Sequence, residues 1–184
     1  MPLLLMVGSG GDPVEVREGR AFSATADKVV ANTITETTLL GTGVGSASLP
    51  AGALAAGRAL LVRVQGYYST AATAPTLTLK VKLGGVVLAS VAVALPVSIV
   101  SKQFAAEILI VCRTAGATGA VMANGAFLAE GASATAHSLA GLTATAAATV
   151  NTTAALAVDL TATWSAASAS NTITATLTKL DLCN

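Results

Sequence analysis

Apolar and polar residues alternate with a period of two along most of the chain, which is the pattern of β-strands with one buried face. In residues 77–83, four leucine and valine residues alternate with threonine and lysine. Gly84 and Gly85 follow, and this dipeptide allows the positive φ angles of a two-residue hairpin turn. The pattern therefore predicts a strand over 77–83 that returns as a second strand over 86–93.

The same alternation predicts a second hairpin and several further strands. Residues 104–112 and 121–129 alternate on either side of a loop of small residues, so they are expected to pair. Near the C-terminus, the apolar phase of residues 173–177 shifts to Leu180 and Leu182, which predicts a bulge near Thr178-Lys179. The remaining predicted strands cover residues 33–40, 60–68 and 156–164.

Two alanine-rich stretches, residues 51–56 and 144–148, do not change this interpretation. Alanine favours helix, but glycine, proline and threonine flank both stretches and β-branched residues dominate their surroundings. Both are therefore expected to be loop or strand. About eight strands with turn signals between them predict an all-β fold, an antiparallel β-sandwich, and a jelly-roll-like arrangement is the one we favour.

The N-terminal residues have a different pattern and predict an extended arm. An apolar tip over 2–7 is followed by a glycine-rich hinge, and four charged residues occur within 15–20. The expected division is therefore an arm over residues 1–28 and a sandwich domain over 29–184. The arm residues predicted to contact another protein are Leu3, Leu4, Leu5, Met6, Val7, Arg17 and Arg20.

The composition is apolar but does not predict a membrane protein. Hydrophobic residues make up 53% of the chain and the mean hydropathy is +0.73, yet a membrane span needs about 20 consecutive apolar residues. The longest suitable run, residues 83–101, is interrupted by glycine, serine and proline. The apolar N-terminal tip is too short for a secretory signal, so synthesis in the cytoplasm without export is expected.

Charged residues are unusually few, and this predicts a surface that other subunits cover. Only 10% of the residues are charged, against about 25% in typical globular chains. The net charge of +1 gives no argument for nucleic acid as a partner. A face of threonine and alanine can be buried against a neighbouring subunit at little cost, because few charges must leave water.

No motif predicts catalysis, a metal ion or a cofactor. The single histidine, His137, has no nucleophile-elbow motif in its surroundings, and the nine carboxylates are scattered. Two distant cysteines and one histidine do not make a zinc site, and Cys112 is expected to be a buried free thiol. The glycines of residues 41–45 lack a following lysine and helix, so they indicate a turn.

The few aromatic residues are assigned to the core or to subunit contacts. Trp164 is expected to anchor the core. Tyr67 and Tyr68 are adjacent on a predicted strand, so one points into the core and the other to the rim or an interface. The residues predicted to contact a neighbouring subunit are Tyr67, Tyr68 and His137.

Five strand-and-turn phrases lie at residues 36–40, 49–54, 74–85, 113–119 and 162–173. Together they resemble small β-sandwich virion proteins of tailed bacteriophages, and the resemblance covers roughly residues 33 to 182. Proteins of this group occur as capsid decoration, or cement, proteins and as domains of tail fibres or spikes. They are usually trimers of jelly-roll-like protomers, and the phrases contain no active-site motif.

The resemblance implies a structural protein rather than an enzyme. It implies a homotrimer that binds the major capsid protein on the outside of the shell, where it stabilises contacts between capsomers. The expected location is the capsid surface of the virion, after assembly in the host cytoplasm. No cofactor, nucleic acid or membrane is expected as a partner.

Two alternatives remain open at this stage. A tail-fibre or spike head that binds a host receptor predicts a cluster of exposed aromatic or carboxylate side chains. A hydrolase on a β scaffold predicts a pocket around His137 or a pair of carboxylates, and it is the weaker alternative because fold alone does not decide function.

Overall fold

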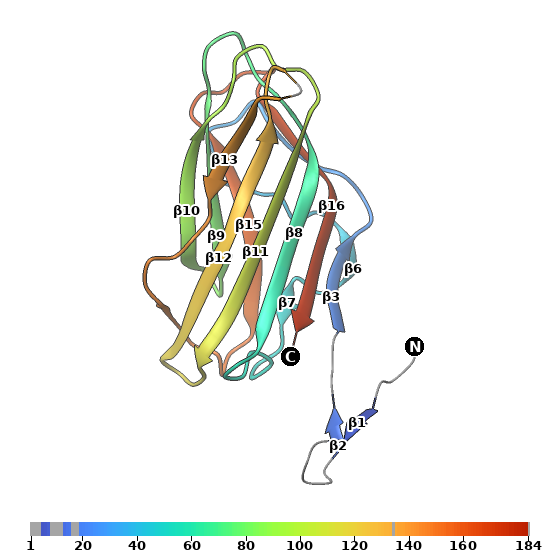
Figure 1. Ribbon diagram of the computed structural model, residues 1–184, viewed down its shortest axis with the longest axis vertical. Helices are drawn as coiled ribbons and strands as arrows, with labels where there is room; N and C mark the ends of the chain where they lie inside the picture. Colours follow the sequence, from blue (N-terminus) through green and yellow to red (C-terminus); the bar gives the residue numbers. More distant parts are fainter. Residues whose placement is uncertain (1–4, 8–12, 16–18, 134, 184) are drawn as a thin grey trace.

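A computed structural model describes residues 5–7, 13–15, 19–133 and 135–183, and the described residues form sixteen β-strands (Figure 1). They contain no helix long and apolar enough to cross a membrane. The strands are β1 (Leu5–Val7), β2 (Pro13–Glu15), β3 (Gly19–Ala24), β4 (Lys28–Ala31), β5 (Thr37–Thr38), β6 (Gly43–Gly45), β7 (Ser48–Leu49), β8 (Ala59–Ser69), β9 (Thr76–Leu83), β10 (Val86–Ala94), β11 (Lys102–Thr114), β12 (Gly119–Glu130), β13 (His137–Gly141), β14 (Ala148–Val150), β15 (Leu156–Trp164) and β16 (Thr172–Cys183).

Two antiparallel sheets pack face to face as a sandwich. The large sheet has nine strands in the order β13-β12-β11-β8-β16-β3-β6, with β14 beside β12 and β4 beside β16. The small sheet has five strands in the order β10-β9-β15-β5, with β7 beside β15, and lies behind the large sheet in Figure 1. The predicted all-β antiparallel sandwich is confirmed, whereas the jelly-roll-like connectivity stays a prediction.

Seven of the eight predicted strands are present as long strands, and the eighth long strand, β3, falls within the predicted arm. Eight strands in the described part of the chain have six or more residues, namely β3, β8, β9, β10, β11, β12, β15 and β16. Both predicted hairpins are present. The turn between β9 and β10 has φ angles of 58° at Gly84 and 83° at Gly85, a conformation that residues with a Cβ atom rarely adopt.

The core lies between the two sheets and is mostly aliphatic. The apolar residues of β9 are completely buried, and so are the inward residues of β8 and β11 that face them across the sandwich. Trp164 is also buried, as predicted, and its indole N–H donates a hydrogen bond of 3.3 Å to the carbonyl oxygen of Val30. Cys112 is the expected buried free thiol, and burial raises its pKa.

The bulge in β16 lies earlier than predicted. The pairing of β16 with β8 shifts register between Ala175 and Leu177, so the phase changes before Leu177 rather than at Thr178-Lys179. Leu177 is therefore 65% exposed, and Thr178 is buried instead. At this point the two backbones approach closely, because a Cβ atom on Gly66 would lie 1.9 Å from the carbonyl oxygen of Thr174.

Two predictions about the N-terminal half were wrong. The strand expected over 33–40 is only β5, a two-residue strand that pairs with β15 at the edge of the small sheet and is followed by the buried Leu39. The arm boundary at residue 28 is too late, because β3 already pairs with β16 and β6 in the large sheet. The sandwich thus begins at Gly19. Strands β1 and β2 pair with each other as a separate two-stranded sheet.

We predict that Trp164→Ala destabilises the fold by about 3–5 kcal/mol, because it removes a buried aromatic side chain and leaves a cavity. Urea unfolding followed by circular dichroism measures the change. Val100→Ala is the control, because Val100 is 76% exposed and its truncation is expected to change stability by less than about 0.5 kcal/mol. Equal losses for the two variants would contradict this account of the core.

Candidate functional site

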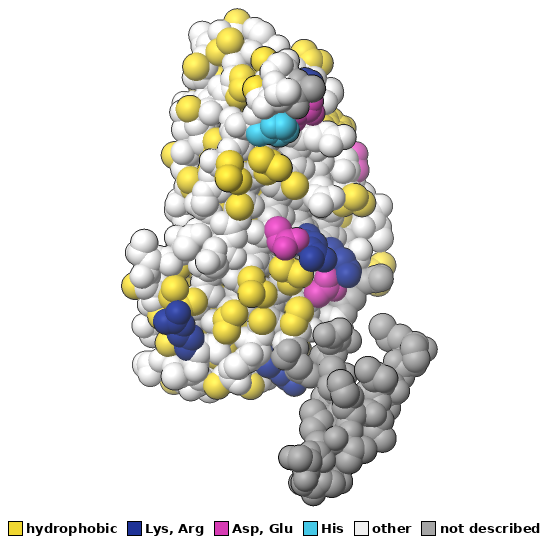
Figure 2. All heavy atoms as spheres, viewed as in Figure 1, with side chains coloured by type: hydrophobic (Ala, Val, Ile, Leu, Met, Phe, Trp, Pro, Cys, Tyr) yellow, Lys and Arg dark blue, Asp and Glu magenta, His cyan; other side chains and the backbone are white. Residues whose placement is uncertain are grey.

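The outer face of the large sheet is the strongest candidate for a functional surface. Alternation along β8, β11, β12, β13 and β16 turns every second side chain away from the core, and the strand register aligns these side chains in rows across the sheet. Figure 2 shows this face, on which hydrophobic side chains are exposed and charged ones are few.

The charges on the middle of this face form a band of ion pairs. We call Arg63, Glu107, Lys179 and Asp181 the charged band. Arg63 Nε lies 2.7 Å from Glu107 Oε2, and Lys179 Nζ lies 2.9 Å from Asp181 Oδ2. Arg63 also sits directly between Glu107 and Lys179 in the register. Two cations and two anions cancel, so the band adds no net charge to the face (Figure 2).

An apolar area lies between the charged band and the end of the sheet where β11 turns into β12. We call it the lower apolar area, and it consists of Leu61, Leu109, Val111 and Met122. Leu109 is opposite Leu61 on β8, and Val111 is opposite Met122 on β12. Leu109 is 43% exposed and the other three are half-buried. Three neighbouring strands, β8, β11 and β12, supply the whole area.

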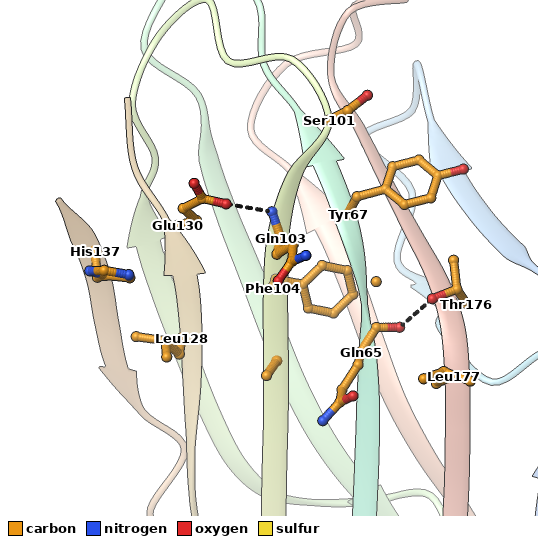
Figure 3. A pocket seen from close by; sticks show the side chains of 12 residues that line it. Gln65, Tyr67, Ser101, Gln103, Phe104, Leu128, Glu130, His137, Thr176 and Leu177 are labelled. Carbon is orange, nitrogen blue, oxygen red and sulfur yellow. Dashed lines mark hydrogen bonds between the residues drawn. The ribbon is translucent and has the colours of Figure 1, made fainter. Parts of the chain in front are cut away.

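A groove lies on the opposite side of the charged band. It has a volume of about 760 Å³ and crosses five strands from β13 to β16 (Figure 3). Phe104 lies in its floor and packs against the buried Phe127, with ring centroids 5.7 Å apart. The lining residues are Gln65, Gly66, Tyr67, Ser101, Gln103, Phe104, Ala105, Leu128, Glu130, His137, Thr176 and Leu177.

The carboxylate of Glu130 is already paired within this groove. Lys102 Nζ lies 2.8 Å from Glu130 Oε1, and the backbone N–H of Gln103 donates to Oε2 at 3.4 Å. These hydrogen bonds, the one from Lys102 first, lower the pKa of Glu130. Beneath it, the hydroxyl of Tyr68 donates to the backbone carbonyl oxygen of Glu130. The strand end that carries Glu130 is therefore anchored from both sides.

The structure brings two of the predicted contact residues together and separates the third from them. Tyr67 and His137 both line the groove, and their assignment to a subunit contact stays a prediction. The prediction for Tyr68 was wrong, because alternation points its ring into the core and leaves none of it exposed. The expectation that the tyrosine pair splits between core and surface is confirmed.

The predicted contact residues of the arm are described only in part. Leu5, Met6 and Val7 form β1, and Arg20 lies in β3, where its backbone is opposite Asp181. The predictions for Leu3, Leu4 and Arg17 lie outside the described residues. Their roles as contacts therefore stay predictions.

Sequence reasoning missed five polar residues of the groove, namely Gln65, Ser101, Gln103, Glu130 and Thr176. Gln65 could have been found, because it is two residues before Tyr67 on one strand and so shares its face. Gln103 and Glu130 carried no such signal, since they reach the groove only through the pairing of β11 with β8 and β12.

Among the residues that the structure describes, no group of three histidine, cysteine, aspartate or glutamate side chains could hold a metal ion. Comparisons with protein-family models, curated proteins and solved structures give no match for this chain. The class of protein that the structure itself defines is an all-β antiparallel sandwich with a charge-poor outer face on its large sheet.

The outer face of the small sheet carries a different charged cluster, which has a structural role. Glu36 accepts hydrogen bonds from Lys80 at 2.6 Å, Lys82 at 2.9 Å and Thr161 at 3.1 Å. The two lysines, followed by Thr161, lower the pKa of Glu36 from 4.5 to about 2. Glu36 thereby fastens the segment between β4 and β5 across the strands β9 and β15.

We predict that Glu36→Gln lowers stability by about 1–2 kcal/mol at pH 7, because the ionised carboxylate is held by two lysines and partly screened by solvent. Folding lowers the pKa of Glu36 from 4.5 to about 2. The extra stability of the wild type over Glu36→Gln is therefore complete above pH 4.5 and is lost as the pH falls towards 2. Thermal unfolding of both proteins between pH 7 and pH 2 measures this.

The matched control is Glu107→Gln, which removes one exposed ion pair from the charged band. It is expected to change stability by less than about 0.5 kcal/mol, because exposed pairs contribute little. If Glu36→Gln lowers stability by the same amount at pH 2 as at pH 7, the carboxylate charge does not have the proposed role.

Proposed function

We propose that this chain is a structural virion protein that decorates the outer shell of a tailed-phage capsid as a homotrimer, with the major capsid protein as its partner. The observation that carries the proposal is the lower apolar area, in which four apolar side chains lie exposed or half-buried on the outer face of the large sheet. Surfaces of this kind suit broad protein contacts that do not rely on a few deep anchoring side chains.

The position of the N-terminal segment supports the same arrangement. Gly19, the first residue of β3, is opposite Leu182 of β16, and the next residue of β16, Cys183, is opposite Ala59. Ala59 is in turn opposite Val111 of the lower apolar area. The chain therefore enters the sandwich at the level of this area (Figure 1). In the proposed arrangement, the N-terminal segment and the lower apolar area contact neighbouring subunits from the same end of the sandwich.

Charge supports the proposal as well. The charged band neutralises itself, so covering the face removes few unpaired charges from water. The sequence phrases that resemble phage virion sandwiches supply the setting in which such a contact would be used. The mechanism is mechanical: binding energy between decoration subunits and capsomers opposes rupture of the shell.

A tail-fibre or spike head that binds a host receptor is the second candidate. The groove favours it, because the groove exposes an aromatic ring together with amide, hydroxyl and imidazole groups.

Imaging of purified virions with a labelled antibody to this chain separates the two candidates. We expect label over the whole shell; label confined to the tail, or none on the particle, would exclude capsid decoration.

We predict that the purified protein has a mass in solution of three protomers of 18.0 kDa and that Leu109→Glu reduces it to one protomer. A buried, unpaired carboxylate in the subunit contact would cost several kcal/mol. Val87→Glu is the matched control, because Val87 is 44% exposed but lies on the small sheet. Light scattering coupled to size-exclusion chromatography measures the masses, and a trimeric Leu109→Glu variant would place the contact elsewhere.

A further inference from the structure

The groove has the chemistry of a small-ligand site, which the proposed shell contact does not use. Its volume of about 760 Å³ lies within the range of small-molecule pockets. Across the strands, Gln103 and Glu130 lie in the row between Tyr67 and His137, and Gln65 lies two residues from Tyr67 along β8 (Figure 3). Amides, hydroxyls and an imidazole both donate and accept hydrogen bonds.

The charges in the groove favour a neutral ligand. Glu130 is the one carboxylate among the lining residues, and Lys102 neutralises it at 2.8 Å. An anionic ligand would meet the Glu130 carboxylate, and a cationic ligand would have to displace Lys102. A neutral ligand with many hydroxyl groups avoids both costs and can use the uncharged amides.

The groove also offers apolar surface beside these polar groups. Tyr67 is 39% exposed, and the exposed side chains of Leu128 and Leu177 lie along the same hollow. An aromatic ring of this kind packs against the C–H face of a sugar ring, while the polar groups around it bind the hydroxyls. Tyr67 and His137 stand on β8 and β13, three strand spacings or about 14 Å apart, which is longer than one sugar ring.

The site is preorganised, because strands and not loops supply most of its lining. The side chains project from five neighbouring strands of one sheet, and the packed rings of Phe104 and Phe127 support the floor. Little conformational entropy is lost when such a site binds. We propose that this groove binds a neutral oligosaccharide across β13, β12, β11 and β8, with Tyr67 as the stacking platform.

The proposal does not depend on capsid decoration, because the groove and the lower apolar area are on opposite sides of the charged band. The test titrates the full ¹⁵N-labelled chain with maltotriose, cellotriose and triacetylchitotriose, each to roughly 10 mM, and follows the amide spectrum. We expect at least one of them to give saturable shifts at the groove residues. Shifts from none of the three, or shifts only outside the groove, would overturn the proposal.

Variants then test the role of Tyr67. Tyr67→Ala is expected to weaken binding about threefold to tenfold, whereas Tyr67→Phe keeps the ring and most of the affinity. Val87→Ala, on the small sheet and outside the groove, should bind as the wild type does. Equal sugar affinity of Tyr67→Ala and wild type would show that Tyr67 is not the stacking platform.

A second copy of the chain would also change the amide signals of the groove residues. If these signals shift with protein concentration in the absence of sugar, a second copy covers the groove and the proposal is overturned.

Discussion

The sandwich depends on the burial of aliphatic side chains between two sheets. Strands β8, β9 and β11 each supply buried side chains to the core. The single tryptophan, Trp164, is buried among them and donates a hydrogen bond to the carbonyl oxygen of Val30. Few aromatic residues are available, so many leucine and valine residues share the burial instead. Along the long strands, alternate residues point inward and are buried between the sheets. The residues between them point outward and form the two outer faces.

Charge on the outer faces is used locally and in pairs. On the small sheet, Glu36 binds two lysines and fastens a loop across the strands. On the large sheet, the charged band and the Lys102–Glu130 pair satisfy their own charges. A chain with so few ionisable groups thereby keeps most of its exposed surface neutral. This neutrality suits both a broad contact with protein subunits and recognition of an uncharged ligand.

The charged band divides the large sheet into two surfaces with different properties. On one side, the lower apolar area is close to the residue at which the chain enters the sandwich. On the other side, the groove is concave and mixes an aromatic ring with amides and hydroxyls. The first surface suits the proposed contact with a shell or with neighbouring copies, and the second would remain uncovered by such a contact.

The sequence by itself determined seven of the long strands, both hairpins, the buried tryptophan and the split of the two tyrosines. Each follows from a local rule, because side-chain direction alternates along a strand and Gly84-Gly85 allows a tight turn. Only the tertiary structure decided the groove, since Tyr67, Gln103 and His137 meet through the lateral order of strands distant in sequence. It also decided the position of the bulge: the register of β16 and β8 shifts between Ala175 and Leu177, next to the close approach of Gly66 to Thr174.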